Sequence, residues 1–333
     1  MSQVVLAIES SCDETAVAIV RDGTEVLANV VASQIELHAE FGGVVPEVAS
    51  RAHLELLEVV IEQALREADM QATDIDAVAA THGPGLIGAL LIGVSAAKAL
   101  ALAWNVPYVG VNHMEGHLFA TFLERPDLEP PLVVLLVSGG HTMLVEVREL
   151  GHYRILGSTI DDAAGEAFDK VARYLGLGYP GGPVIDKLAL EGDRDAIKFP
   201  RGLINEGLDF SFSGMKTSVI NYVRKHPNAA NEDLAASFQE AVVDVLVAKA
   251  MRAAIEVDAR GVCLGGGVAA NSRLRERFAE AAAAEGLDCL VPARSFCTDN
   301  AAMIAAAGYW RLATDGPSPL DGGAYPGLRL PTV

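Results

Sequence analysis

The sequence predicts an α/β protein in which helices cover both faces of its sheets, and two observations support this class. Short apolar runs typical of buried strands alternate with longer segments that carry apolar residues at helical spacing. A strand–turn–strand pattern near the start, VVLAIESSCDETAVAIV, returns about 130 residues later as LVVLLVSGGHTMLVEV. Together with the length of 333 residues, the repeat predicts two domains of similar construction.

Composition places the chain among compact proteins. Hydrophobic residues make up 51% of it and charged residues 21%, while the formal net charge of −19 opposes binding of nucleic acid by the chain alone. The cysteines at 12, 263, 289 and 297 form no CxxC pair, and MSQVVLAIES lacks the features of a signal peptide. We therefore expect a cytoplasmic protein with reduced thiols.

The first half reads as three strands, a helix, a strand, a helix, a strand and a final short helix. The predicted ranges are 4–9, 16–23, 25–33, 50–68, 75–83, 85–104, 107–111 and the helix of the NHMEGH motif. Residues 77–97 carry no Asp, Glu, Lys or Arg and are long enough to cross a bilayer. Pro84 and several glycines interrupt them, so we predict a buried strand, a glycine loop and a buried helix.

The second half begins at the proline-rich crossing ERPDLEPP. Its predicted elements are the strands 132–137 and 142–147, a helix over 163–176, a long helix over 231–258, a strand over 261–266, a helix over 272–286, a strand over 289–292 and a helix over 298–313. We predict an N-terminal domain over residues 1–128 and a C-terminal domain over 129–333, and allow for the last helix to pack back on the first domain.

NHMEGH, residues 112–117, carries the first candidate site. His113 and His117 lie one helical turn apart and share a face, so they could hold one metal ion. Zinc proteases place their glutamate directly after the first histidine. Glu115 instead lies roughly 200° around the helix from His113 and should face away. The alternative is a helix whose histidines only cap or pack.

Three glycine turns expose backbone that could contact an anion. Ser138-Gly139-Gly140 joins two strands and could form an anion nest, or be an ordinary hairpin turn; a Walker A loop would need a following GK[ST] and a helix. Gly265–Gly267 leads from a strand into a helix whose N-terminus could face phosphate or ribose. NAD binding is rejected because Asp288 precedes its strand. YPGGP, residues 179–183, is either a third loop that exposes its backbone to a ligand or only a connection between two helices.

We expect a side chain at Gly266 to fill the ligand's space while leaving the fold largely intact.

Three carboxylates complete the candidate set. Asp13 and Glu14 lie in the first hairpin turn, where acids are usually solvated but could position a metal or a reacting group. Asp299 stands where aspartate often caps a helix, and it is also the best-placed third ligand for the two histidines.

Ten segments, in this order along residues 4–310, resemble the TsaD family of tRNA N6-adenosine threonylcarbamoyltransferases. They are IESSCDET, GGVVPEVASRAH, HGPGLIGALLIG, NHMEGHL, LLVSGGHT, DDAAGEAFDK, YPGGP, DFSFSGMKT, GGGVAANSRLR and FCTDNAAMIA. The resemblance implies two duplicated actin-like (ribonuclease H-like) domains with a nucleotide cleft between them. It also implies transfer of the threonylcarbamoyl group from threonylcarbamoyl-AMP to N6 of the adenosine 3′ to the anticodon, in tRNAs that read codons beginning with A.

The resemblance also implies the site residues. His113, His117 and Asp299 match the family's ligands for one iron ion, with zinc or another divalent ion as the alternative. Residues matching the family's adenylate-binding positions are Leu136, Val137, Ser138, Gly139, Gly140, Asp169, Gly182, Asp186 and Asn271. From the residues alone, Asp169 and Asp186 read as the solvated side of helices. Glu14 is our nominee for the general base.

The implied partners are tRNA, threonylcarbamoyl-AMP, a paralogous subunit and a small ATPase, with no membrane. A basic track could contact tRNA; it comprises Lys198, Arg201, Lys216, Arg224 and Lys225. The apolar face of the helix over residues 50–68 could dock a partner or be buried in its own domain. Competing readings are a metal-dependent glycoprotein endopeptidase, a nucleotide-binding scaffold subunit and a small-molecule kinase of the same fold.

Overall fold

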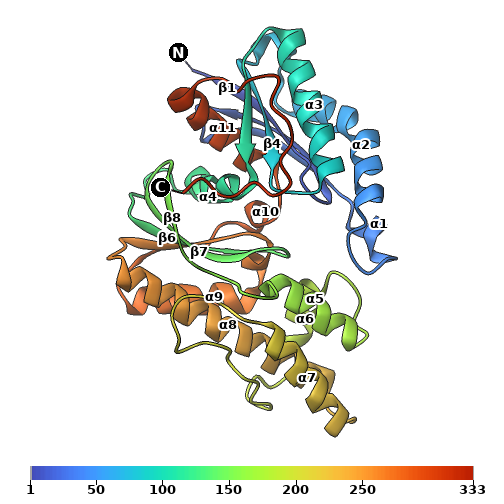
Figure 1. Ribbon diagram of the computed structural model, residues 1–333, viewed down its shortest axis with the longest axis vertical. Coiled ribbons are helices and arrows are strands. Elements are labelled where there is room, and N and C mark those ends of the chain that lie inside the picture. The colour runs from blue at the N-terminus through green and yellow to red at the C-terminus, as the bar shows by residue number, and fades with distance from the viewer. Residues whose placement is uncertain (1, 333) are drawn as a thin grey trace. The chain divides into compact units, whose positions relative to one another are not determined.

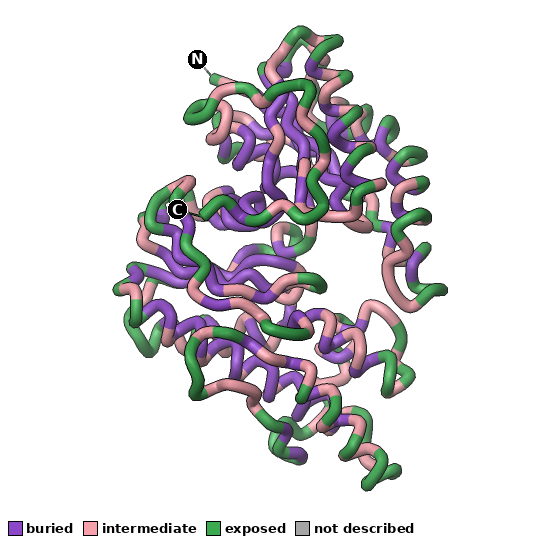
Figure 2. The backbone as a smooth tube through the Cα atoms, viewed as in Figure 1, coloured by how far each residue is buried: buried purple, intermediate pink, exposed green. Residues whose placement is uncertain are grey.

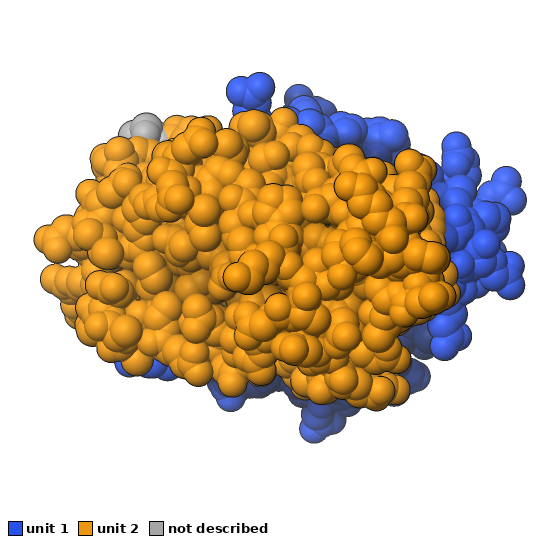
Figure 3. Space-filling view, turned by 90° about the horizontal axis from the view of Figure 1, so that it is seen from below, with its two compact units in different colours: residues 1–128, 298–330 blue, residues 129–297, 331–333 orange. Residues whose placement is uncertain are grey.

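The computed structural model describes residues 2–332, which divide into two compact units (Figure 3). Unit 1 combines the residues up to Leu128 with Thr298–Leu330, and unit 2 consists of Glu129–Cys297 and the chain end from Pro331. The sequence assigned residues 129–333 to the second domain but allowed for the last helix to pack back on the first. In the structure the segment from Thr298 to Leu330, with the last helix, belongs to unit 1.

Both units are built on a sheet of the same strand order. The order is β3-β2-β1-β4-β5 in unit 1 and, in the same sense, β8-β7-β6-β9-β10 in unit 2. In each unit the first three strands pair antiparallel, and the first strand also pairs in parallel with the fourth. The predicted α/β class and the repeated hairpin are therefore confirmed.

Unit 1 follows the predicted order closely (Figure 1). Its strands are β1 Val4–Glu9, β2 Glu14–Arg21, β3 Glu25–Ser33, β4 Ala77–Gly83 and β5 Tyr108–Asn112. Its helices are α1 Ile35–Ala39, α2 Pro46–Glu67, the short helix η1 Ala72–Asp74, α3 Ile87–Trp104, α4 His113–Glu124 and α11 Ala301–Asp315.

Unit 2 contains elements that the sequence did not suggest. Its strands are β6 Leu132–Val137, β7 Thr142–Glu149, β8 His152–Ser158, β9 Gly261–Gly265 and β10 Asp288–Leu290. Its helices are α5 Ala164–Tyr174, α6 Gly181–Ala189, α7 Ser213–Lys225, α8 Asn231–Glu256, η2 Gly267–Ala270, α9 Ser272–Ala284 and α10 Arg294–Cys297. We did not predict β8, α6 or α7.

Helices cover both faces of the unit 1 sheet, and its central strand is buried throughout (Figure 2). Alternate residues of a strand point to opposite faces. Leu6 and Ile8 of β1 accordingly share one apolar cluster with Leu57 of α2 and Val94 of α3. The other face packs on α11, as Figure 1 shows.

The packing of α11 is close because its buried face is made of small residues. A Cβ added to Gly308 of α11 would lie 2.7 Å from the Cβ of Ala79 in β4. On the α4 side, a Cβ added to Gly116 would lie 2.6 Å from Cδ1 of Ile304 in α11. The Cβ of Ala79 cannot move aside, so Gly308 is required for α11 to lie against the sheet, whereas at Gly116 the end of the Ile304 side chain could shift.

The uncharged stretch at 77–97 forms a strand, a loop and a helix, as predicted. Among the described residues, α3 is the one helix that is long and apolar enough to cross a membrane by length and composition, with a mean hydropathy of 1.8. It packs on β4 and α2 within unit 1. The helix is not buried all round, however, because Leu91 and Leu102 are 47% and 66% exposed.

A chain of buried hydrogen bonds fixes the start of β2. Cys12 O must accept from Nε2 of His53, 3.0 Å away, so Nδ1 of that ring accepts the hydroxyl proton of Thr15 over 2.7 Å. Thr15 Oγ1 in turn accepts from Gln34 Nε2 at 3.3 Å. Each donor therefore meets one acceptor, and His53 is neutral. Its pKa is lowered by burial, which favours the same neutral form.

We expect the substitution Thr15→Val to lower the free energy of unfolding by about 1–3 kcal/mol. Valine keeps the shape of the side chain but leaves Nδ1 of His53 and the amide of Gln34 without their buried partner. Denaturant unfolding at pH 7 measures the change. The matched control is Thr314→Val at an exposed position of α11, which should change little; equal effects of the two substitutions would contradict the role given to Thr15.

Candidate active site

The helix α4 begins at the first histidine of the NHMEGH motif because Asn112 caps it. The side chain of Asn112 accepts hydrogen bonds from the backbone N–H groups of Met114 at 2.9 Å and Glu115 at 3.3 Å. Its own amide donates to Arg329 O at 2.9 Å. The cap ties the helix start to the strand β5 and to the chain end of unit 1, so the histidines project from a fixed point.

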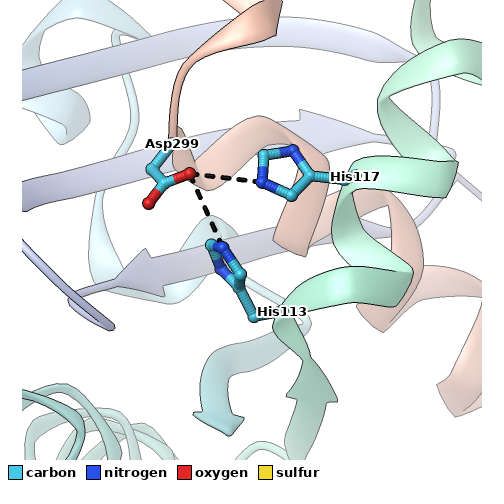
Figure 4. Close-up of side chains that lie close together, drawn as sticks. All are labelled: His113, His117 and Asp299. Atoms are coloured by element: carbon cyan, nitrogen blue, oxygen red, sulfur yellow. Dashed lines mark ion pairs between the residues drawn. The ribbon is translucent and has the colours of Figure 1, made fainter. Parts of the chain in front are cut away.

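His113, His117 and Asp299 converge within unit 1 (Figure 4). The Nε2 atoms of His113 and His117 lie 3.5 and 3.2 Å from the same oxygen, Oδ1 of Asp299. The histidines are 8% and 2% exposed. Asp299 does not cap α11, because the side chain of Asn300 accepts from Met303 N instead. The carboxylate is therefore directed to the two imidazoles, as Figure 4 shows.

The three donor groups fit a metal ion. Bonds of about 2.0–2.2 Å from nitrogen and oxygen ligands to one ion place neighbouring ligand atoms about 3.0–3.5 Å apart. The two measured separations match that spacing, and one ligand atom from each residue lies within 4.8 Å of the others. Within the described part of the chain, neither ring nitrogen of buried His117 has a hydrogen-bond partner of suitable geometry. A metal would satisfy this imidazole.

Glu115 faces away from the cluster, as its helical position predicts. Its carboxylate is 1% exposed and accepts from Nε and Nη2 of Arg311 at 3.0 and 2.8 Å. This ion pair joins α4 to α11. A zinc-protease base would have to face the metal ligands, so the geometry excludes that role for Glu115.

Several carboxylates surround the cluster, which makes it strongly acidic. Burial raises the pKa of Glu14, at the start of β2, to about 10, with further contributions from the charges of Asp299 and Asp13. Burial lowers the pKa of His113, but the charges of Asp299 and Glu9 outweigh this and raise it to about 9. Both shifts indicate a site that favours added positive charge.

Unit 2 holds the predicted anion-binding turn. Ser138, Gly139 and Gly140 join β6 to β7, and a Cβ added to either glycine would meet nothing within 4 Å. Gly165, in the first turn of α5, donates its N–H to Ser138 O at 3.3 Å. The N-terminus of α5 therefore lies at the turn, and both features favour a negatively charged ligand. Leu136 and Val137 are the buried end of β6 that leads into it.

The other residues implied by the resemblance tie the helix ends of unit 2 together. Asp169 of α5 accepts from Gly181 N at the start of α6, at 2.7 Å. Asp186 of α6 accepts from the backbone and hydroxyl of Ser272 at the start of α9. Asn271 caps α9 through Leu274 N and donates to Gln239 of α8 at 2.7 Å. Reading the two aspartates as solvated was therefore wrong.

These two aspartates could have been found from the unpaired backbone of their partners. The N-termini of α6 and α9 each present N–H groups that need an acceptor. The YPGGP loop before α6 offers no side chain that caps, and only the fold shows that acids of other helices supply the acceptors. Glu9, whose carboxylate contacts His113, was also missed, because it reads as the last residue of a buried strand.

The expected tolerance of Gly266 to substitution is contradicted. Gly266 has φ of +85°, and a Cβ there would lie 2.5 Å from the backbone oxygen of Val137 in β6. A side chain would both strain the backbone and push β6 away. At Gly267 and Gly182, by contrast, a Cβ meets nothing within 4 Å. These two glycines are the positions where a side chain could block a ligand without disturbing the fold.

Fold and site together define a class: an actin-like α/β protein with an open glycine turn in one unit and a histidine–carboxylate cluster in the other. Solved structures share the fold. HypF of T. kodakarensis matches with a TM-score of 0.65 at 16% identity, over 94% of this chain and 48% of that one. Component A of (R)-2-hydroxyglutaryl-CoA dehydratase from Acidaminococcus fermentans gives 0.57 at 16% identity, over 94% of this chain and all of that one.

The sequence comparisons give the family. The model of tRNA N6-adenosine threonylcarbamoyltransferase matches residues 25–306. Curated proteins of that name from Caldicellulosiruptor saccharolyticus and Clostridioides difficile are 54% and 52% identical, over 98% and 99% of both chains. The chain therefore belongs to the tRNA N6-adenosine threonylcarbamoyltransferase family. It is a transferase that modifies tRNA by transferring a threonylcarbamoyl group to N6 of an adenosine.

Proposed function

We propose that His113, His117 and Asp299 hold one divalent ion, with iron as the expected metal, and that unit 2 holds the adenylate for the same transfer. The observation that carries the metal proposal is the convergence of two buried Nε2 atoms on one carboxylate oxygen. Two histidines and one carboxylate with open positions are typical of iron(II), and zinc accepts the same donors. The ion would act as a Lewis acid toward carbamoyl or phosphate oxygens.

The adenylate proposal rests on the turn and helix ends of unit 2. The Ser138–Gly140 turn and the start of α5 suit the phosphate, and Gly182 leaves open space at the start of α6. A cavity of about 400 Å³ in the same unit suits the base; among its lining residues are Leu190, Gln239, Glu240, Ser272 and Arg273. Ser272 binds Asp186, and Gln239 binds Asn271. The cavity therefore adjoins two of the adenylate-binding residues that the resemblance implies, Asp186 and Asn271.

The bond changes define what the protein must supply. N6 of the adenosine forms a bond to the carbamoyl carbon, the bond from that carbon to the AMP oxygen breaks, and N6 loses a proton. The backbone N–H groups of Gly139 and Gly140 would stabilise the departing phosphate, whereas that of Ser138 donates to His141 O at 2.8 Å. Glu14 remains our nominee for the base, with one condition. At a pKa of about 10 it is protonated at neutral pH, so it accepts a proton only where positive charge at the cluster lowers its pKa.

The charge of the chain also determines how well it can bind tRNA without partner proteins. Lys198, Arg224 and Lys225 are exposed, whereas Arg201 pairs with Asp244 at 2.8 Å and is not available to the predicted track. Three exposed cations do not offset a net charge of −19. We therefore propose that tRNA modification depends on a paralogous subunit and a small ATPase.

The surface for the paralogous subunit is proposed on α2 and α3, which contact each other. Most of the predicted apolar stripe of α2 packs inward, but Leu54 is 72% exposed and Val59 is 56% exposed. On α3, Ile87 and Leu91 are 49% and 47% exposed and lie one turn apart. Apolar side chains gathered on two adjacent helices are typical of a protein–protein contact.

We expect His113→Ala and His117→Ala each to lose bound metal and threonylcarbamoyl transfer, because two remaining ligands do not hold the ion in a defined geometry. Glu115→Gln should keep both, although loss of the charge paired with Arg311 should lower the free energy of unfolding by about 1–3 kcal/mol. Metal analysis and nucleoside mass spectrometry of modified tRNA provide the readouts. A dead Glu115→Gln beside active histidine variants would refute the assignment.

We expect Gly267→Val to fold normally but to bind an adenylate analogue at least about tenfold more weakly, a loss of ~1.4 kcal/mol. Its side chain would enter open space beside the proposed ligand. Gly266→Val should instead destabilise the protein, since it strains the backbone against β6. Titration calorimetry and thermal unfolding separate the two effects. Unchanged affinity in folded Gly267→Val would remove the adenylate from this turn.

We expect the chain alone, supplied with preformed threonylcarbamoyl-AMP and tRNA, to show little multiple-turnover activity until the paralogous subunit and the ATPase are added. Leu91→Glu should abolish binding of the paralogous subunit, whereas Ile255→Glu, the same kind of apolar-to-charged change at an exposed position of α8 in unit 2, should not. Pull-down and turnover assays test both statements. Full turnover by the isolated chain would show that the partners are dispensable.

A further inference from the structure

The two nitrogens of the His113 ring meet different groups. Nε2 faces Asp299, as described above, while Nδ1 lies 3.0 Å from Oε2 of Glu9 and 3.2 Å from Oγ of Ser11. Glu9 is the last residue of β1 and is fully buried. A carboxylate can only accept, so the proton between the two side chains belongs to Nδ1 when His113 is neutral. Nε2 then carries the lone pair.

We propose that Glu9 is a positioning residue for the metal, acting through His113. It accepts the Nδ1–H hydrogen bond, which selects the tautomer that directs a lone pair from Nε2 at the ion and holds the ring plane toward Asp299. The proposal rests on the proposed metal site. It goes beyond that site because Glu9 is not a ligand in it: its carboxylate lies on the opposite edge of the imidazole.

Glu9 is itself held in place, which a positioning role requires. Oε1 accepts from the backbone N–H of Ser11 at 2.5 Å, and Oε2 accepts from the hydroxyl of Thr81 in β4 at 2.6 Å. Both oxygens thus have fixed donors, one in the turn that follows β1 and one on the neighbouring strand β4. The orientation of the His113 ring is therefore set by the sheet as well as by α4.

The two histidines differ in this respect. Nδ1 of His117 has no hydrogen-bond partner among the described residues, so packing and the approach of Nε2 to Asp299 orient that ring. His117 is 2% exposed, and its helix is fixed against α11 at Gly116. The Asn112 cap fixes the backbone of His113 at the first position of α4, but it does not set the rotation of the imidazole. The hydrogen bond to Glu9 of β1 sets that rotation.

A purely structural role for Glu9 is the competing explanation, since it also links β1 to β4 through Thr81. The two roles predict different results for the variant Glu9→Gln. A structural residue affects the unfolding of the metal-free protein and leaves the affinity of the folded protein for metal unchanged. A positioning residue affects the affinity and the coordination spectrum in protein that remains folded.

The experiment measures binding of cobalt(II) to the full chain by competition with a chelator, together with the visible absorption of the bound ion. We expect Glu9→Gln to weaken binding about 10- to 100-fold and to alter the absorption spectrum. Thr15→Val is the matched control, a buried substitution in the same unit that does not touch the cluster, and it should leave both readouts unchanged. Thermal unfolding of each metal-free variant confirms that it is folded.

Glu9→Asp provides a second variant, because it keeps the charge but withdraws the carboxylate from Nδ1; an intermediate affinity is expected. Nitrogen-15 NMR of the zinc-loaded wild-type protein gives a test that needs no variant, and it should show His113 protonated at Nδ1 and bound through Nε2. Unchanged affinity and spectrum in folded Glu9→Gln, or the opposite tautomer, would overturn the proposal. If the wild-type chain binds neither metal, the metal site itself is wrong.

Discussion

The close packing of α11 in unit 1 is the contact on which the candidate site depends. The chain leaves unit 1 after Leu128 and returns at Thr298. The small residues of α11 let this helix lie against β4 and α4, and this packing brings Asp299 to the histidines. Asp299 stands two positions before the helix, so docking of α11 fixes where its carboxylate can reach. A larger residue at Gly308 would push α11 from β4 and so move Asp299 relative to the histidines without touching any of the three.

The same hairpin occurs in both units, but its turn carries acidic side chains in unit 1 and an open glycine backbone in unit 2. In unit 1 the turn between β1 and β2 carries acids, and the acids around the cluster raise the pKa of His113 and Glu14. In unit 2 the corresponding turn is Ser138-Gly139-Gly140, whose glycines leave the backbone open and adjoin the start of α5. One duplicated fold therefore offers a site suited to a cation and a site suited to a phosphate, which a transferase acting on an adenylate requires.

Much of this arrangement could be predicted from the sequence, and what could not has a physical cause. The hydrophobic periodicity, together with the Gly and Pro residues that end each element, predicted the strands and most helices. The spacing of His113 and His117 predicted that they share a helix face. Both are local properties of the sequence. Asp299 could be named as a ligand but not placed, since its position depends on packing across some 180 residues of intervening chain. Asp169 and Asp186 were misread because their partners are backbone groups of other helices. Gly266 was misjudged because its positive φ and its contact with β6 appear only in the fold.

The geometry of α4 also explains why a motif that looks like a protease fragment serves another chemistry. The two histidines of α4 face Asp299, which lies just before α11. Glu115 faces in another direction and pairs with Arg311, near the end of α11. The two contacts fix α4 to α11 at two separated points. The glutamate of the motif instead holds α11, the helix that follows Asp299. Glu115 is buried and paired with Arg311, so it cannot also accept a proton from water, and the base that we nominate beside the cluster is Glu14 instead.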